Sequence, residues 1–492
     1  MSLFPPIPGV MGSKSHQPIH VFFFPLMGHG HLRPTIDMAK LFAARGVKAT
    51  IVTTPRNMPL IYKTCGVNID IQIIKFPAVE AGLPEGCENI ESLTSLEMVQ
   101  NFIKATKMLQ QPLQQLLQDH QPSCLVADDF FPWANDVAAK FGIPRLVFNG
   151  TSFFSLTICH AMRRYEPHKK VSSDSEVFVI PNFPGEIKLT RKQLPNFTQQ
   201  EVETDITKLL KEVTEAELSS YGVVVNSFYE LESDYADFYR KVLGRKAWHI
   251  GPVSLRNKGA EDKAPRGKES SIDEHDCLKW LGTKKPNSVV YICFGSIANF
   301  SDSENCFSDS LLMEIAMGLE ASEQHFIWVV KNGENEKEKE DWLPKGFEKR
   351  MEGKGLILRG WAPQVLILAH EAVGGFVTHC GWNSILEGVS AGVPMVTWPM
   401  RADQFYNAKL VTQVLRIGVD VAAQQWKRME GDTIKREAID KAVRQIMVGE
   451  EAEEMRSRAK KLGEMAKRAV EDGGSSYSDL NVLIEELRSH CP

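Results

Sequence analysis

Features that would assign this 492-residue chain to several large classes of protein are missing from its sequence. No apolar run approaches the length of about 18 residues that a membrane-spanning helix needs. There is no excess of basic residues either: 57 Lys and Arg against 62 Asp and Glu give a formal net charge of -5, whereas nucleic-acid-binding proteins usually carry a basic surface. We therefore expect no nucleic acid as a partner and no stable membrane insertion.

Paired cysteines are missing as well. The nine cysteines are scattered, none form a C-x-x-C motif, and their odd number does not suit a disulfide framework. Buried free thiols in a reducing compartment explain this pattern. Residues 1–18 lack the charged and apolar regions of a signal peptide, so we expect a flexible leader on a cytoplasmic protein.

The sequence does contain a repeated alternation of strands and helices. The run IHVFFFPL, residues 19–26, is apolar throughout, which is typical of a parallel strand that is buried on both faces. A helix is then expected over residues 35–46, where apolar residues recur at helical spacing before Gly46. Because such units follow one another along the chain, the sequence predicts an α/β fold with parallel sheets.

This alternation pauses once, which indicates two domains. Residues 254–271 are charged, contain Gly and Pro and have almost no apolar side chains, as a linker does. We expect two Rossmann-like, doubly wound domains that face a cleft. Their predicted bounds are 19–253 for the N-terminal domain, 272–470 for the C-terminal domain, and 471–492 for a last helix that packs back on the N-terminal domain.

The most informative segment reads WAPQVLILAHEAVGGFVTHCGWNSILEGVSAGVPMVTWPMRADQ, residues 361–404. A strand that ends at His379 leads through a turn into a helix expected to begin with Ser384 as its N-cap. The free N–H groups of a helix N-terminus favour a diphosphate. Glu387 follows Ser384 by one helical turn, where its carboxylate accepts ribose hydroxyls or forms a capping box; the residues alone leave both alternatives open.

This segment resembles the signature box of plant secondary-product UDP-glycosyltransferases. That box is also 44 residues long, and its W-A-P-Q, H-C-G-W-N-S, glutamate and final D-Q are all present. The resemblance extends over nearly the whole chain and implies the two-domain GT-B fold, with a UDP-sugar held mainly by the C-terminal domain. It implies Trp361 and Ala362 at the uracil, Gln364 and Glu387 at the ribose, His379, Asn383, Ser384 and Ser296 at the diphosphate, and Trp382, Asp403 and Gln404 at the sugar.

Two positions of the box bear on the identity of the sugar. By resemblance, the last residue is usually Gln in relatives that use glucose and often His in those that use galactose; here it is Gln404. Relatives that use glucuronate can carry Arg at the position of Trp382, where it pairs with the carboxylate. UDP-glucose is therefore the expected donor, with galactose and xylose as alternatives.

A histidine and an aspartate at strand ends are the candidates for catalysis. Sugar transfer to a hydroxyl needs a base, which suits histidine, and a carboxylate that orients it. The stretch PLMGHGHLRP, residues 25–34, offers His29 and His31, and the strand SCLVA is followed by Asp128 and Asp129. The carboxyl ends of neighbouring parallel strands line one crevice, so such residues can meet.

The family pattern distinguishes between these neighbours. G-H-x-x-P selects His31 as the base, and V-A-D at the strand end selects Asp128 as its partner. His29 is then expected in a loop, and Asp129 is expected to cap the following turn. The implied reaction is a single inverting displacement that gives a β-glucoside.

Neither a metal nor a cofactor other than the donor sugar nucleotide is expected. The nucleotide region has no D-x-D pair, and the spacing of His29 and His31 without a neighbouring ligand cluster is a weak zinc pattern. The same turn fails the dinucleotide fingerprint, because Arg33 stands at the third glycine position. A dinucleotide-dependent oxidoreductase is therefore disfavoured, and the presence of both His31 and Asp128 disfavours a non-catalytic binder.

Aromatic residues after the N-terminal strands are the candidates for an acceptor pocket. They suit a flat or bulky hydrophobic molecule, but they equally suit core packing. The resemblance favours a flavonoid or other phenolic as acceptor, with a triterpenoid or steroid sapogenin as the alternative, and we expect a monomer. Gly28 and Arg33 depart from the family pattern beside His31, and Arg33 has no explanation in the sequence. The acceptor candidates are Phe130, Phe131, Thr151 and Phe153.

Overall fold

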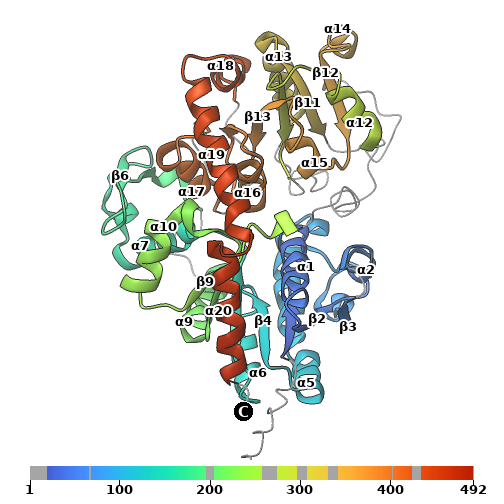
Figure 1. Cartoon of the computed structure of the whole chain (residues 1–492), viewed down its shortest axis with the longest axis vertical. Helices are drawn as coiled ribbons and strands as arrows, with labels where there is room; N and C mark the ends of the chain where they lie inside the picture. The colour runs from blue at the N-terminus through green and yellow to red at the C-terminus, as the bar shows by residue number, and fades with distance from the viewer. Residues whose placement is uncertain are drawn as a thin grey trace, which may run out of the picture.

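Two α/β domains, one above the other, make up the molecule (Figure 1). The computed structural model describes residues 19–65, 68–195, 204–256, 274–295, 307–330, 342–401, 403–423 and 434–490. The predicted leader and all but the first three residues of the predicted linker lie outside these ranges. No helix within the described ranges has both the length and the apolar character that crossing a membrane requires.

The N-terminal half forms a seven-stranded parallel sheet with the order β3-β2-β1-β4-β5-β8-β9. The chain runs outward from β1 in one direction and then returns to β4 on its other side, so the order reverses between β1 and β4. The strands are β1 (His20–Phe24), β2 (Lys48–Thr53), β3 (Ile69–Ile73), β4 (Cys124–Asp128), β5 (Arg145–Asn149), β8 (Gly222–Val225) and β9 (Ala247–His249).

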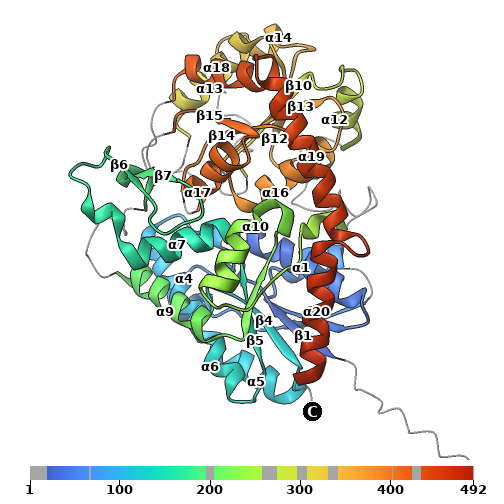
Figure 2. The same ribbon diagram turned by 60° about the vertical axis from the view of Figure 1, so that its left-hand side comes forward.

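Helices cover both faces of this sheet, and a small antiparallel hairpin projects beside it (Figure 2). The helices are α1 (His29–Ala43), α2 (Met58–Cys65), α3 (Ala78–Ala81), α4 (Leu96–Met108), α5 (Gln110–His120), α6 (Ala134–Ala139), α7 (Phe153–Tyr165), α9 (Asp205–Ser219) and α10 (Tyr229–Asp237). The hairpin consists of β6 (Val177–Val179) and β7 (Lys188–Thr190).

The C-terminal half forms a six-stranded parallel sheet with the order β12-β11-β10-β13-β14-β15, which reverses between β10 and β13. The strands are β10 (Val289–Cys293), β11 (His325–Val330), β12 (Gly355–Arg359), β13 (Val373–Thr378), β14 (Met395–Thr397) and β15 (Gly418–Asp420). The helices are α12 (Glu274–Leu281), α13 (Asp309–Ser322), α14 (Phe347–Arg350), α15 (Gln364–Leu368), α16 (Trp382–Ala391), α17 (Gln404–Lys409) and α18 (Arg436–Met447).

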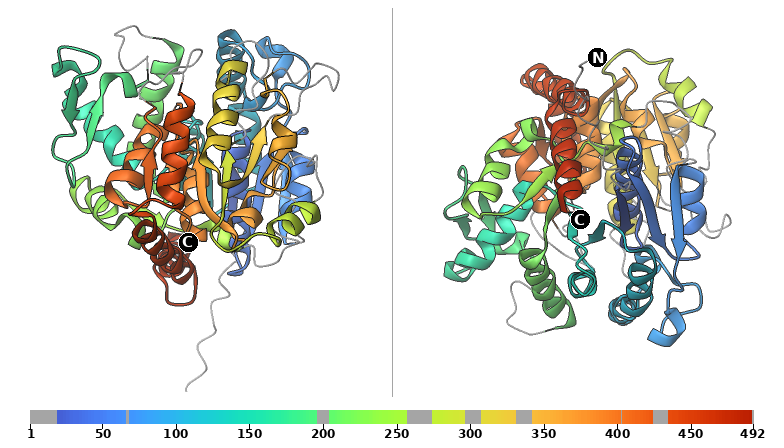
Figure 3. Two further views of the ribbon diagram at one scale, coloured as in Figure 1. Left: turned by 90° about the horizontal axis from the view of Figure 1, so that it is seen from above. Right: turned by 60° about the horizontal axis from the view of Figure 1, so that its bottom comes forward.

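The last two helices connect the two domains. α19 (Ala452–Val470) packs on α16 of the C-terminal sheet domain, and α20 (Ser475–His490) packs on β9 of the N-terminal one. Leu480, Leu483, Ile484 and Leu487 of α20 are buried in the core cluster that also contains Val21 of β1. Figures 2 and 3 show these red helices along one side of the molecule.

Each sheet has a buried apolar cluster on each of its two faces, because its strands are apolar on both sides. Side chains alternate between the faces of a strand. Val21 and Phe23 accordingly belong to one buried cluster, and Phe22 and Phe24 to the other. A strand with two buried faces must be apolar at every position, which is the pattern that the sequence shows for residues 19–26.

One helix boundary differs from the sequence prediction in a way that matters for the site. We expected a helix over residues 35–46 and a loop at His29, and this is wrong: α1 begins at His29, with Gly28 as an extended N-cap. Pro34 therefore lies inside the helix rather than before it. Proline is usually taken as a helix boundary, which is why the first turn was not predicted.

Candidate active site

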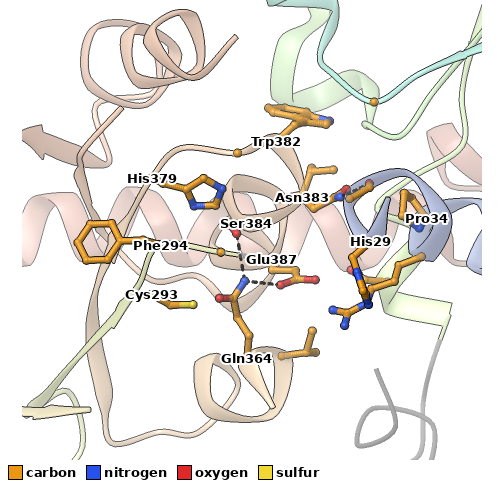
Figure 4. A pocket seen from close by; sticks show the side chains of 18 of the residues that line it. His29, Pro34, Cys293, Phe294, Gln364, His379, Trp382, Asn383, Ser384 and Glu387 are labelled. Atoms are coloured by element: carbon orange, nitrogen blue, oxygen red, sulfur yellow. Dashed lines mark hydrogen bonds between the residues drawn. The ribbon is translucent and has the colours of Figure 1, made fainter. Parts of the chain in front are cut away.

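A cleft lies where the carboxyl ends of the two sheets meet. The reversal points of both strand orders, β1/β4 and β10/β13, open toward it, and this is where open parallel sheets bind ligands. From the N-terminal domain the cleft is lined by the start of α1, Gly150 and Asn226; from the other domain it is lined by residues 360–365 and by the start of α16, among others (Figure 4).

His31 and Asp128 are in direct contact at the N-terminal wall. The Nδ1 atom of His31 lies 2.7 Å from Oδ2 of Asp128, although the residues are 97 positions apart. Asp128 is 1% exposed, and its second oxygen accepts the backbone N–H of Phe130 at 3.2 Å. Because Nδ1 faces the carboxylate, Nε2 is the nitrogen left to contact a substrate in the cleft.

The charge of Asp128 determines the basicity of this histidine. Burial by itself lowers the pKa of His31, but the negative charge of Asp128 and its hydrogen bond outweigh burial and raise that pKa to about 9. In turn burial favours the neutral form of Asp128, yet the charge of His31 and the hydrogen bond hold the pKa of this carboxyl below its usual value. Below pH 9 the pair is therefore mainly an imidazolium next to a carboxylate.

The close approach of β5 leaves room for no side chain beside the His31 ring. A Cβ atom at Gly150 would lie 3.3 Å from Cε1 of His31. A glycine at this position thus lets the imidazole lie against the backbone.

The two histidines of the GHGH stretch face different partners. The backbone N–H of His29 donates to Oε1 of Glu91 at 2.6 Å, and its ring Nδ1 lies 3.3 Å from the same oxygen. The His29 ring lies 6.1 Å from the ring of Trp361, on the opposite domain. His29 therefore faces Glu91 and Trp361 and takes no part in the contact between His31 and Asp128.

Gly28, which departs from the family pattern, is explained by its neighbour Ile90. A Cβ atom at Gly28 would lie 2.6 Å from Cδ1 of Ile90, so a larger residue here would require the Ile90 side chain to move. The loop that carries Ile90 also supplies Glu91 to His29. This pairing of distant positions has no signal in a single sequence.

Asp129 does not cap the following turn, and that prediction is wrong. The carboxylate of Asp128 takes this role instead, by accepting the N–H of Phe130. Burial, the charge of Asp128 and a hydrogen bond to Asp128 raise the pKa of Asp129 well above its ordinary value. Asp129 is thus a neutral carboxyl against an ionised one.

Within the described residues, His31, Asp128 and Asp129 also place one possible metal-ligand atom each within 4.8 Å of one another. The hydrogen bonds inside this group already account for its geometry: His31 bonds Asp128, and Asp129 shares its proton with the same carboxylate. Two of its three ligand atoms would first have to lose these bonds to take a cation.

In the C-terminal wall, the helix after β13 begins earlier than expected. Gly381 is the N-cap of α16, with no side-chain cap, so Trp382, Asn383 and Ser384 are its first three residues. The prediction that Ser384 is the N-cap is therefore wrong, and so is the capping-box alternative for Glu387. The N–H groups of these three residues have no partner within the helix, as at any helix start, and they are available to an anion in the cleft.

Glu387 instead forms a side-chain cluster with Gln364. The Nε2 atom of Gln364 donates to Oε2 of Glu387 at 2.7 Å and to Oγ of Ser384 at 3.1 Å (Figure 4). Both predicted ribose ligands thus lie together, next to the helix start. Ala362, just before Gln364, is buried and lines the same part of the cleft.

His379 lies against two glycines at the predicted diphosphate position. Cβ atoms at Gly295 and Gly381 would lie 2.6 and 2.4 Å from its ring, and Gly295 has φ +73°. His379 is 6% exposed, and its Nδ1 has no hydrogen-bond partner. Burial and the charge of Arg401 lower its pKa to about 4, so the ring is neutral. Ser296, the remaining predicted diphosphate ligand, lies outside the described residues.

The predicted sugar ligands connect the two domains. The hydroxyl of Thr151 donates to Asp403 Oδ2, and the indole N–H of Trp382 donates to the carbonyl of Asn226 at 2.8 Å. Oε1 of Gln404 accepts the N–H groups of Met400 and Arg401, which leaves its Nε2 as the hydrogen-bonding group for a ligand. Trp382, Asp403 and Gln404 all line the cleft.

A further cross-domain bond depends on Pro34. In an α-helix the N–H of residue 34 would donate to the carbonyl of Gly30, but proline has no N–H. This carbonyl instead accepts Nδ2 of Asn383 at 2.7 Å. Figure 4 shows Asn383 directed toward the start of α1, beside His29 and Pro34.

The acceptor candidates divide into two groups. The ring of Phe130 lies 5.9 Å from that of His31 in an edge-on arrangement, and Thr151 contacts Asp403. Phe131 and Phe153 are fully buried and pack on Phe24 and His249. None of the four candidates is among the residues that line the cleft. For Phe131 and Phe153 the core alternative describes the observed packing.

Comparison with protein families finds a match over residues 270–455 to the family described as UDP-glucoronosyl and UDP-glucosyl transferase. Among curated proteins, the scopoletin glucosyltransferase of Nicotiana tabacum is 58% identical over 478 residues, which cover 96% of this chain and 98% of that protein. The UDP-glucose flavonoid 3-O-glucosyltransferase 7 of Fragaria ananassa is also 58% identical, over 97% of this chain and 98% of that protein.

Solved structures give the same fold. The crystal structure of UGT73P12 from Glycyrrhiza uralensis, in complex with glycyrrhetinic acid 3-O-monoglucuronide, superposes with a TM-score of 0.88. Its sequence is 40% identical, and the match covers 96% of each chain.

Proposed function

Because the chain belongs to the UDP-glucoronosyl and UDP-glucosyl transferase family and is a UDP-glycosyltransferase with the GT-B fold, we propose that it transfers glucose from UDP-glucose to a hydroxyl of a flavonoid or other phenolic. The observation that carries this proposal is the contact of 2.7 Å between His31 and Asp128, across the cleft from the signature box. A base and a donor site that face each other are what a direct displacement needs.

The chemistry follows from this arrangement. Neutral His31 takes the proton of the acceptor hydroxyl on Nε2 while the oxygen attacks the anomeric carbon of the sugar. The bond between that carbon and the diphosphate oxygen breaks, and its electron pair leaves with UDP. One displacement inverts the anomeric centre, so an α-linked donor gives a β-glucoside. Asp128 stabilises the imidazolium that forms.

The donor is proposed to lie along the C-terminal wall. Trp361 and Ala362 would bind the uracil, Gln364 and Glu387 the ribose, and His379 with the first residues of α16 the diphosphate. The unpartnered Nδ1 of His379 and the free N–H groups of the helix start support this assignment. Since neutral N–H donors and a helix dipole serve the departing diphosphate, the proposed reaction needs no metal.

The glucose end would meet Asp403, Gln404 and the start of α16. Gln404 supports glucose, with galactose and xylose as alternatives, and the ring of Trp382 stands where a glucuronate user can carry arginine. The N–H of the Trp382 indole is bonded to Asn226, so its contact with the sugar would use the ring or the backbone N–H.

Two observations bear on the acceptor. Relatives that are 58% identical act on scopoletin and on a flavonoid, as their names state, and Phe130 supplies an aromatic wall beside His31. The alternative, a triterpenoid acceptor, is favoured by UGT73P12, which was solved with glycyrrhetinic acid 3-O-monoglucuronide. We place the reaction in the cytosol, in keeping with the six described cysteines that are free thiols.

One experiment tests the activity and its acceptor together. The purified protein is incubated with UDP-glucose and a panel of flavonols, coumarins and sapogenins, and products are detected by mass. A hexose added to phenolics but not to sapogenins is the expected result; sapogenin products alone would establish the alternative acceptor. His31→Ala should abolish transfer and keep UDP binding. Normal turnover by this variant would refute the base assignment.

A further inference from the structure

Arg33 stacks on the signature tryptophan across the cleft. The guanidinium carbon of Arg33, on α1 of the N-terminal domain, lies 4.0 Å from the centre of the Trp361 ring. Trp361 follows β12 of the C-terminal domain. At this distance the two groups are in direct contact, so no third ring fits between them.

Arginine is suited to this contact. Its guanidinium is flat and delocalised, so it can stack face to face on an aromatic ring, whereas a lysine ammonium acts there as a point charge and an aliphatic side chain brings no charge. Nε and Nη2 of Arg33 are buried, so the plane is enclosed by protein rather than held in solvent. At this position the family pattern often has a hydrophobic residue, so the contact is a feature of this chain.

The stack is part of a larger contact between α1 and the signature box, residues 361–404. The ring of His29, one helical turn before Arg33, lies 6.1 Å from the same indole. Between them, the carbonyl of Gly30 accepts the hydrogen bond of Asn383. The start of α1 therefore contacts the signature box at its first residue and at the start of α16.

We propose that Arg33 is a positioning residue for the donor, which holds the Trp361 indole from the N-terminal side so that the uracil stacks on its opposite face. This inference depends on the proposed function, since it requires a UDP-sugar in the cleft. The base would then form the third layer of a ladder of guanidinium, indole and uracil. This positioning role accounts for the presence of an arginine at position 33 of α1.

A role for the charge of Arg33 is the competing explanation. Among the described residues that line the cleft, Arg33 is the one arginine or lysine, and UDP is an anion. The two explanations predict different ligand dependence. Support of the indole affects uridine and UDP alike, whereas an ionic contact to the diphosphate affects UDP and spares uridine.

The test uses two substitutions and a matched control. Arg33→Met removes both plane and charge, and Arg33→Lys keeps the charge but loses the plane. Arg45→Met is the control, because Arg45 lies two residues after the end of the same helix and stacks on Tyr477 at 4.6 Å, among residues that do not line the cleft. Binding of uridine and UDP is measured by calorimetry, and KM and kcat by initial rates.

We expect both Arg33 variants to weaken uridine and UDP binding and to raise the KM of UDP-glucose by about 3- to 10-fold, the range of a partly desolvated cation–π contact. Arg45→Met should change none of these, and kcat should stay within about 2-fold because the stack does not touch the reacting atoms. In a Trp361→Leu background, Arg33→Met should have no further effect on uridine binding.

Three results would overturn the proposal. Tighter uridine binding by Arg33→Met would mean that the guanidinium occupies the uracil's own face. Wild-type affinity in Arg33→Lys, or a loss for UDP but not for uridine, would assign the effect to charge. Unchanged binding in both variants would leave Arg33 no role at the donor. If the wild-type protein binds UDP but transfers no sugar, the proposed function fails and the Arg33 test still stands.

Discussion

At the scale of single residues, the charge of Asp128 controls when His31 can act as a base. A base must be neutral, and the pKa of His31 is raised to about 9. We predict that kcat/KM for the acceptor rises with pH, reaches half its maximum near pH 9 and levels off above it, because this parameter reports ionisation of the free enzyme. Rates measured from pH 5 to 10 give the profile.

Asp128→Asn supplies the contrast for that profile. Without the carboxylate charge, burial lowers the pKa of His31 against the smaller effects of Asp129 and Glu91, so the rising limb should shift to lower pH. The plateau should nevertheless fall by about 100-fold or more, since the imidazolium loses its stabilising partner and its fixed tautomer. An unshifted limb would show that a group other than His31 titrates.

The neighbouring Asp129 should behave in the opposite way. Its pKa is raised well above the usual value, so it keeps its proton to a higher pH than an ordinary aspartate, and an asparagine mimics this protonated form in shape and charge. Asp129→Asn is therefore expected to keep kcat within about 5-fold, against the much larger loss in Asp128→Asn. A loss in Asp129→Asn equal to that in Asp128→Asn would mean that the ionised form of Asp129 is required.

For single residues, the sequence predictions and the structure differ where a contact comes from a distant element. The pairing of His31 with Asp128 was predictable, because both stand at ends of strands that flank a reversal of strand order. The clash that restricts position 28 involves Ile90, and the stack on Arg33 involves Trp361, which is 328 positions away in sequence. No local pattern in the sequence links position 28 to Ile90 or Arg33 to Trp361.

At the scale of elements, the first turns of α1 lack one helical hydrogen bond and form a contact with the signature box instead. Pro34 lacks the N–H that would bond the Gly30 carbonyl, and this carbonyl accepts Asn383 instead. A proline inside a helix costs about 3 kcal/mol. Pro34→Ala should therefore raise the thermal unfolding temperature while it raises the KM of UDP-glucose, because the restored N–H competes for the carbonyl.

Calorimetry and initial rates check these two opposite changes. The double variant with Asn383→Ala is the control: if Pro34 acts through Asn383, Pro34→Ala should add no further rise in KM to that background. If Pro34→Ala raises the KM of UDP-glucose by the same factor in the Asn383→Ala background as in the wild type, the effect comes from a general shift of α1 instead.

The start of α16 shows why helix ends were harder to predict than helices. A helix near residue 384 was expected and is present, but serine's preference for the N-cap suggested a start three residues late. The hydroxyl of Ser384 accepts Gln364 from another element, so it is not needed as a cap. A tertiary contact has displaced a local preference, and the shift places the N–H groups of Trp382, Asn383 and Ser384 at the helix start.

At the scale of the whole molecule, the fold class could be predicted and the coupling between the two sheets could not. Continuous apolar strands and strand–helix alternation indicated two parallel α/β sheets, and the solved relatives confirm the GT-B fold. The contacts that cross the cleft, such as Thr151 with Asp403 and Trp382 with Asn226, depend on how two separately folded surfaces meet. No periodicity within either half encodes that geometry.

The last helix makes this coupling testable. Leu483 of α20 is fully buried in the core cluster around β1, whereas its neighbour Val482 is 57% exposed. Removing a buried leucine side chain costs about 2–5 kcal/mol. Leu483→Ala should thus lower the unfolding temperature clearly, and Val482→Ala should not.

The location of any loss of stability is informative as well. Leu483 belongs to the C-terminal end of the chain but to the core of the N-terminal sheet, so the change should reach hydrogen exchange of β1 and β9 as well as that of α20. Because α20 contributes no residue to the lining of the cleft, kcat and the KM of UDP-glucose at 20 °C should match those of Val482→Ala. Faster exchange confined to α20, with β1 and β9 unchanged, would mean that this helix rests on the N-terminal domain without stabilising it.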